Sequence, residues 1–133
     1  MGAINCSIIT PERTLFEGEV SGVQLQAHDG SMGFLPGHAP LIAELGIGEL
    51  KLVRGGSTEY MVVEGGIVEI RDNQLIVLAE TAFEKADLDK AELEAKLSQL
   101  VAQKDGLAKF SDERSQIILE QEKIKARIKV AVR

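Results

Sequence analysis

Hydrophobic and polar residues alternate in short runs over the first ~85 residues of the chain. Gly, Pro, Asp or Asn bounds each run, and none keeps a 3.6-residue spacing long enough for a helix. The turns at Gly55-Gly56 and Asp72-Asn73 each separate two such runs, which is typical of β-hairpins. The predicted strands are 4–10, 14–19, 20–27, 49–54, 59–64, 67–71 and 75–79. The pattern predicts an all-β body, as a sandwich or a barrel.

The period changes after Phe83, where helix-forming residues take over. A helix is predicted over 88–104, with Asp87 or Asp89 as its N-cap and Gly106 as its end. One face is formed by Leu93, Leu97, Leu100 and Lys104, with Val101 beside them. The opposite face carries Leu88, Ala91, Ala95 and Ala102. These small residues either lie in solvent or contact a further surface.

A second helix is predicted over 111–132, with Ser111 as its N-cap. Its main apolar stripe consists of Ile117, Ile124, Ile128, Ala131 and Val132. A weaker stripe, more than a third of a turn away, consists of Leu119, Ala126 and Val130. Because one neighbouring helix covers only one stripe, the second is expected to pack on the β body or on another protein.

Charge divides the chain at the same place. Residues 1–86 hold twelve acids and five bases, a net charge of −7, whereas residues 87–133 hold nine acids and ten bases, a net charge of +1. From residue 123 onward there are only bases: Lys123, Lys125, Arg127, Lys129 and Arg133. They flank the isoleucine stripe on both sides, so this end is either a solvated cationic tail or a docking surface for an acidic partner.

Composition excludes several classes of protein. Aromatic residues make up only 4% of the chain and Trp is absent, so the core must be aliphatic. The acidic body argues against nucleic-acid binding, which requires a positive face. No apolar run reaches the ~20 residues of a membrane span, and the N-terminus does not resemble a secretory signal. The single cysteine, Cys6, fits a reducing compartment and is expected to be buried in the first strand.

No arrangement of residues predicts catalysis. His28 and His38 are the only histidines and lack further ligands at metal-binding spacing. No Ser or Cys lies in a nucleophile signature, and the glycine-rich segments lack the lysine of a phosphate-binding loop. We therefore expect no catalytic residue, no metal and no cofactor.

One segment is distinctive. Residues 30–41 read Gly-Ser-Met-Gly-Phe-Leu-Pro-Gly-His-Ala-Pro-Leu, and Thr10-Pro11-Glu12, Leu15 to Gly18, Val63 to Ile70, Leu78 to Ala82 and Asp87-Leu88-Asp89 accompany it. These motifs resemble the epsilon subunit of bacterial F-type ATP synthases, called delta in mitochondria. The likeness spans essentially the whole chain, although the second helix matches only loosely.

The resemblance implies a β-sandwich of about ten strands over 1–86 and an antiparallel two-helix hairpin over 87–133. It implies a non-catalytic central-stalk subunit that couples proton-driven rotation of the c-ring to ATP synthesis. Such a subunit contacts gamma, the c-ring, beta and alpha, peripherally on the cytoplasmic face of the bacterial plasma membrane. By position, Asp29, Gly30, Ser31 and Met32 resemble the loop that meets the c-ring. His38 resembles part of the gamma-facing surface, or else holds its own loop.

In this family the hairpin either folds on the sandwich or extends along gamma, where it inhibits ATP hydrolysis by engaging an acidic segment of beta. The basic run, Lys123, Lys125, Arg127, Lys129 and Arg133, is the expected contact. Some members bind ATP through Ile/Leu-Asp-x-x-Arg-Ala, but here Glu92 replaces the arginine, so no ATP binding is expected. The alternative is a free-standing β-sandwich module whose hairpin recruits another acidic partner.

Overall fold

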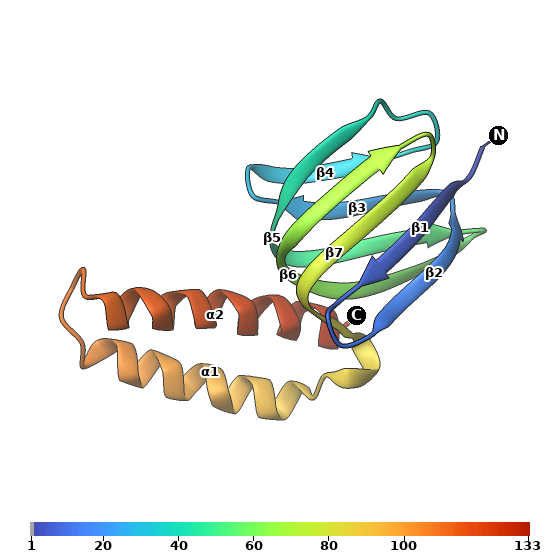
Figure 1. Cartoon of the computed structure of the whole chain (residues 1–133). Helices are drawn as coiled ribbons and strands as arrows, with labels where there is room; N and C mark the ends of the chain where they lie inside the picture. Colours follow the sequence, from blue (N-terminus) through green and yellow to red (C-terminus); the bar gives the residue numbers. More distant parts are fainter. Residues whose placement is uncertain (1) are drawn as a thin grey trace.

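The strands of the body form one continuous sheet that folds over into two layers (Figure 1). The computed structural model describes residues 2–133, and in them seven strands pair in the order β2-β1-β7-β6-β5-β3-β4. The strands are β1 (Ile4–Ile9), β2 (Thr14–Val20), β3 (Gly22–Ala27), β4 (Gly30–Phe34), β5 (Leu41–Arg54), β6 (Ser57–Arg71) and β7 (Gln74–Glu84). All neighbours are antiparallel except β1 and β7. The predicted β-sandwich is confirmed.

The strand number is lower than the expected ten because β5 and β6 are long and contribute to both layers. Their pairing is interrupted between Leu45 and Ile47 of β5, opposite Gly65 and Gly66 of β6. Gly66 has φ +121°, and a Cβ there would lie 2.0 Å from the carbonyl oxygen of Leu78, so only glycine fits. These glycines are bends within continuous strands.

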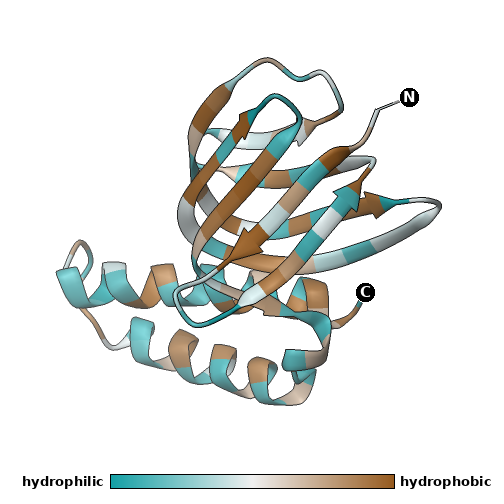
Figure 2. Ribbon diagram, turned by 45° about the vertical axis from the view of Figure 1, so that its right-hand side comes forward, coloured by the Kyte–Doolittle hydropathy of each residue, from teal (hydrophilic) through white to brown (hydrophobic). Residues whose placement is uncertain are grey.

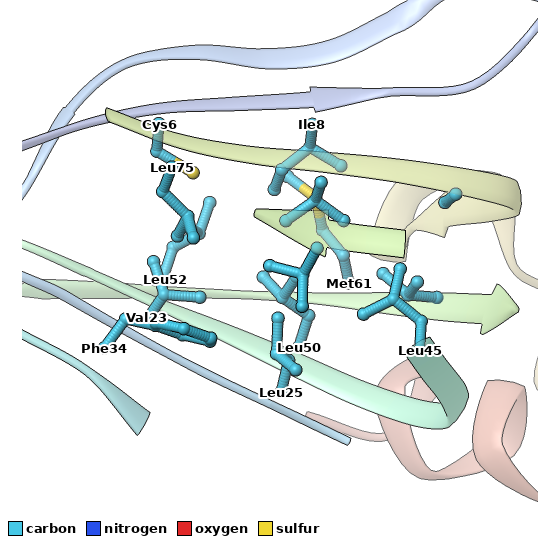
Figure 3. Close-up of a cluster of buried hydrophobic side chains, with 14 of the residues drawn as sticks. Cys6, Ile8, Val23, Leu25, Phe34, Leu45, Leu50, Leu52, Met61 and Leu75 are labelled. Carbon is cyan, nitrogen blue, oxygen red and sulfur yellow. The ribbon is translucent and has the colours of Figure 1, made fainter. Parts of the chain in front are cut away.

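The core between the layers is aliphatic, as predicted. It is built from inward-facing side chains of all seven strands. Figure 3 shows Ile8, Leu25, Phe34, Leu50, Leu52, Met61 and Leu75 among them, and Ile4 and Ile70 are buried in the same core. Cys6 is buried among them, as expected, and burial raises the pKa of its thiol to about 12. It therefore behaves as a small apolar side chain rather than a nucleophile.

The helical hairpin begins after a short 3-10 turn, η1 (Lys85–Asp87), and consists of α1 (Lys90–Asp105) and α2 (Asp112–Ala131). Asp89 is the N-cap of α1, and its side chain accepts a hydrogen bond from the backbone N–H of Glu92. Ser111 accepts one from Arg114 in the same way and begins α2. Gly106 ends α1 as predicted, although in a right-handed conformation. The predicted helix limits are therefore correct to within two residues.

Burial on α1 follows the predicted face. Leu100 is buried, Leu93, Leu97 and Lys104 are half-buried, and the alanine side is exposed. The alanines therefore do not pack on the β body, so the further surface that the sequence left open is not part of the body.

The hairpin lies against one layer of the sandwich, and its tip projects away from the body (Figure 1). α2 contacts β5, β6 and α1. The weaker stripe of α2 lies toward the body, because Ala126 lines a cavity with β5 residues and Val130 is fully buried. Figure 2 shows hydrophilic residues banding both helices along their length, in contrast to the longer hydrophobic stretches of the strands.

Candidate functional site

The surface beneath α2 is formed by the outward-facing residues of three neighbouring strands. Residues paired across antiparallel strands share a face, so this surface can be read from the register. It consists of Ile47, Glu49 and Lys51 of β5, Tyr60, Val62 and Glu64 of β6, and Thr81 and Phe83 of β7. We call it the docking face. Val62 is fully buried although it is not part of the sandwich core, because the hairpin covers it.

Arg127 of α2 binds the centre of the docking face. Its Nε and Nη2 donate hydrogen bonds to the two carboxylate oxygens of Glu64, at 2.6 and 2.8 Å. Thr81 donates a third hydrogen bond to Glu64, at 2.9 Å, and the guanidinium lies 4.4 Å from the centre of the Phe83 ring. The Glu64 side chain is 0% exposed and that of Arg127 is 19% exposed. Hydrogen bonding to this carboxylate raises the pKa of the Arg127 guanidinium above its ordinary value.

Arg133, next to the end of α2, repeats this arrangement. Its Nε and Nη2 each donate a hydrogen bond of 2.7 Å to Glu49, and its guanidinium lies 4.3 Å from the centre of the Tyr60 ring. Lys85 donates to the backbone carbonyl oxygen of Arg133. The pKa of Arg133 is raised above its ordinary value, and the hydrogen bond to Glu49 is the main cause. Two bidentate pairs thus join the end of the chain to the body.

The other three bases behave differently. Lys125 and Lys129 are exposed and Lys123 is half-buried. Within residues 2–133, none of the three takes part in an ion pair. The five bases therefore do not act as one uniform unpaired run in this state. The sequence gives little signal for the two arginine pairs, because each joins residues 63 or 84 positions apart.

The segment expected to be the c-ring loop is mostly strand. Only Asp29 lies in the β3–β4 turn, whereas Gly30, Ser31 and Met32 belong to β4. The pairing of β3 with β4 extends as far as Gly30, and within it Met32 pairs with Leu25 and packs partly on the core. Asp29 is exposed at the end of this β-hairpin.

His38 lies beyond the other end of β4, apart from Asp29. Its Nδ1 is 2.7 Å from the carbonyl oxygen of Ala39, its backbone N–H donates to Leu35, and its ring packs against Phe34 with centroids 5.0 Å apart. These three contacts lie within its own loop and the adjacent end of β4, and they stabilise the turn that follows β4.

A second surface, which the sequence reasoning missed, lies on the other layer. Ile67 and Leu78 face each other across β6 and β7, and Ile42 and Ile76 flank Glu69 in the neighbouring row. These four side chains point outward, and Ile42, Ile67 and Leu78 are 67%, 48% and 50% exposed. We call them the outer apolar face. The run Leu75 to Ala79 is apolar on both sides of the strand, which is the signal that could have revealed it.

The remaining chemistry of the described residues is sparse. Residues 2–133 contain no group of three or more His, Cys, Asp or Glu side chains that could hold a metal ion. No helix among them is both long and apolar enough to cross a membrane. Glu92, expected from the resemblance to replace an ATP-binding arginine, is exposed in the first turn of α1.

Comparison with known proteins agrees with this architecture. The family of the ATP synthase delta/epsilon chain β-sandwich domain matches residues 3–85. The ATP synthase epsilon chain of Leptospira borgpetersenii is 38% identical over 130 residues, covering 98% of this chain and 96% of that protein. The epsilon chain of Anoxybacillus flavithermus is 38% identical over 95 residues, 71% of each chain.

The fold is also found among solved structures. A chain of the Euglena gracilis mitochondrial ATP synthase superposes with a TM-score of 0.86 at 19% identity, covering all of this chain and 83% of that one. At this identity the likeness concerns the fold alone, but it includes the hairpin as well as the sandwich. On the evidence of the sandwich match and the full-length relative, the chain belongs to the delta/epsilon chain family of ATP synthases.

Proposed function

We propose that this chain is a non-catalytic central-stalk subunit of a rotary ATP synthase, with a β-sandwich (1–86) that holds the stalk and a hairpin (87–133) that restrains ATP hydrolysis. The observation that carries the proposal is the full-length similarity to epsilon chains, which includes the hairpin. Its expected place is peripheral, at the cytoplasmic face of the bacterial plasma membrane, with contacts to gamma, the c-ring, beta and alpha.

The outer apolar face supports a permanent partner for the sandwich. Four aliphatic side chains gathered on one sheet face are unfavourable in water, and such patches mark interaction sites. We propose that gamma covers this face, with the His38 loop at its margin, and that the β3–β4 turn at Asp29 to Met32 meets the c-ring.

Co-purification tests the stalk assignment. Extraction of the tagged chain from membranes should recover alpha, beta, gamma and c subunits with it. Ile67→Asp together with Leu78→Asp places two charges on the outer apolar face and should abolish recovery of gamma, whereas Lys96→Asp on exposed α1 should not. Recovery of the chain without any of these subunits would refute the assignment and favour a free-standing module.

Hairpin removal tests the regulatory half. Deleting Asp87 to Arg133 should leave ATP synthesis largely intact and raise ATP hydrolysis, because the hairpin proposed to inhibit hydrolysis is removed. Unchanged hydrolysis would mean that the hairpin does not inhibit. We further propose that the chain does not bind ATP, since Glu92 would repel phosphate; calorimetric titration giving micromolar MgATP affinity would contradict this.

A further inference from the structure

Arg127 and Arg133 bind two places of the same construction. In each, a carboxylate accepts two hydrogen bonds from the guanidinium while an aromatic ring lies beside it, at 4.4 or 4.3 Å. We call these two places the guanidinium sockets. The first consists of Glu64, Thr81 and Phe83, and the second of Glu49 and Tyr60.

Both features of a socket select arginine over lysine. A planar guanidinium presents two parallel N–H groups to a carboxylate and stacks on an aromatic ring, whereas an ammonium is a compact point charge. The occupancy agrees with this preference. Lys123, Lys125 and Lys129 lie on the same helix, and none takes part in an ion pair within residues 2–133.

We infer that the docking face is a guanidinium-specific receptor for α2, and that the docked state depends on Arg127 and Arg133 rather than on the total positive charge of the helix.

The rest of the contact contributes little apolar burial. Cavities of about 500 and 710 Å³ flank α2 where it crosses the body. Among residues 2–133, Val62 is the only body residue outside the sandwich core whose apolar side chain is fully buried, and on α2 the fully buried apolar side chains are Ile124 and Val130. The two sockets supply the ion pairs that join this end of the chain to the body.

The sockets also allow the helix to leave. A buried carboxylate without its partner is strongly destabilising, but Glu64 lies on the outward side of β6, where Arg127 of α2 binds it, so we expect it to be exposed when α2 departs. When α2 departs, water reaches Glu64 and no charge is stranded. An apolar face of the same size would instead favour permanent closure.

The two arginines and the three lysines then have different regulatory roles, a consequence that rests on the proposed function. An arginine held in a socket cannot bind an outside carboxylate, whereas the three lysines can. Arginine-to-lysine changes should therefore release the hairpin while keeping its charge, and strengthen inhibition of hydrolysis. Changing Lys123, Lys125 and Lys129 to alanine should weaken inhibition without undocking the hairpin.

A cysteine beneath the helix measures docking directly in the full-length chain. Val62→Cys places a small thiol at a fully buried position under α2, and the native Cys6 does not compete because its thiol is buried with a pKa of about 12. Labelling with a thiol reagent then proceeds only when α2 departs. Ala126→Cys, on the body-facing side of α2, provides a second reporter from the other side of the contact.

Arg127→Lys and Arg133→Lys should each raise the labelling rate by about tenfold or more, as expected for losing a bidentate pair. The matched control, Lys125→Ala, should leave it within about twofold, since Lys125 is exposed and forms no ion pair with residues 2–133. Unchanged labelling after both arginine substitutions, or an equal rise in the control, would overturn the inference that the docking face is specific for guanidinium groups. Either result would leave the stalk assignment intact, because co-purification decides that separately.

Discussion

The two sides of strand β6 are covered in different ways. Met61 and Val63 point inward and are buried by aliphatic side chains, whereas Val62 and Glu64 point outward and are buried by a helix that binds through arginines. The inner side closes by apolar burial, which is irreversible short of unfolding. The outer side closes through ion pairs on a surface that water can also cover. By the inference above, one strand thus carries a permanent and a reversible interface.

The two outward-facing surfaces of the body also differ in their side-chain chemistry and in whether another element covers them. The outer apolar face exposes Ile42, Ile67 and Leu78, and no described element covers it. The docking face is mainly charged, polar and aromatic, and α2 covers it. Side-chain chemistry therefore separates a surface suited to constant association from one suited to alternating occupancy.

The largest effect is expected from the inner side. Leu50→Ala removes a fully buried side chain and should lower the free energy of unfolding by ~2–5 kcal/mol in urea denaturation followed by circular dichroism. Arg127→Lys should shift the same unfolding transition much less, because it releases the hairpin without opening the core. Equal losses from both would mean that the hairpin is an integral part of the sandwich.

Salt should distinguish the two interfaces next. Raising NaCl from ~0.05 to ~0.5 M shortens the screening length to a few ångströms and should increase Val62→Cys labelling several-fold, with the Arg133 pair affected first because it is more exposed. The urea midpoint of the body should not fall in parallel. Salt-independent labelling would show that apolar contacts, rather than the sockets, hold α2.

A smaller gain is expected within the hairpin. Gln121 is 5% exposed on α2, and its Nε2 has no hydrogen-bond partner among the described residues. By helical spacing it shares the stripe of Ile117, Ile124 and Ile128. Gln121→Leu should therefore stabilise the hairpin by ~1 kcal/mol, measured as slower amide exchange in α1 and α2. Faster exchange would mean that the amide has a partner that the structure does not contain.

The smallest effect concerns the junction. Asp87 accepts hydrogen bonds from the backbone of Glu84 and from Arg13, and these lower its pKa below the ordinary 3.8. A lowered folded pKa stabilises the folded state above pH ~4, and this contribution disappears as the pH falls through the folded value. Between pH 6 and 3 the native chain should thus lose slightly more stability than Asp87→Asn. Parallel pH profiles would contradict this role.

Local signals were sufficient to predict most of the fold. Alternation and turn residues located most of the strands, and Asp89, Ser111 and Gly106 fixed the helix limits because capping depends on neighbours within four residues. The exceptions were β4 and the first half of β5. No strand was predicted over either segment, whereas in the structure Gly46 and Gly48 of β5 approach β3 so closely that a side chain would collide with it.

The site was predicted less completely, for a related reason. The helix wheel indicated a second apolar stripe on α2, and it left open whether the bases are solvated or bind an acidic partner. It could not indicate that the acidic partner of Arg127 and Arg133 is the body itself, since Glu64 and Glu49 are distant in sequence and resemble any other strand glutamates. Only the register of β5, β6 and β7 brings these residues together.

The bend at Gly65-Gly66 has a consequence for how such a chain can evolve. Glu64 of the docking face and Ile67 of the outer apolar face are three residues apart on either side of it. A single truncation after β7 removes the hairpin, but no truncation removes its receptor, because the receptor is part of the strand that carries the other surface. A lineage that lost the hairpin would therefore keep the strands that form the docking face. The carboxylates and aromatic residues of that face would then be free to change, and their loss would increase with the time since the hairpin was lost.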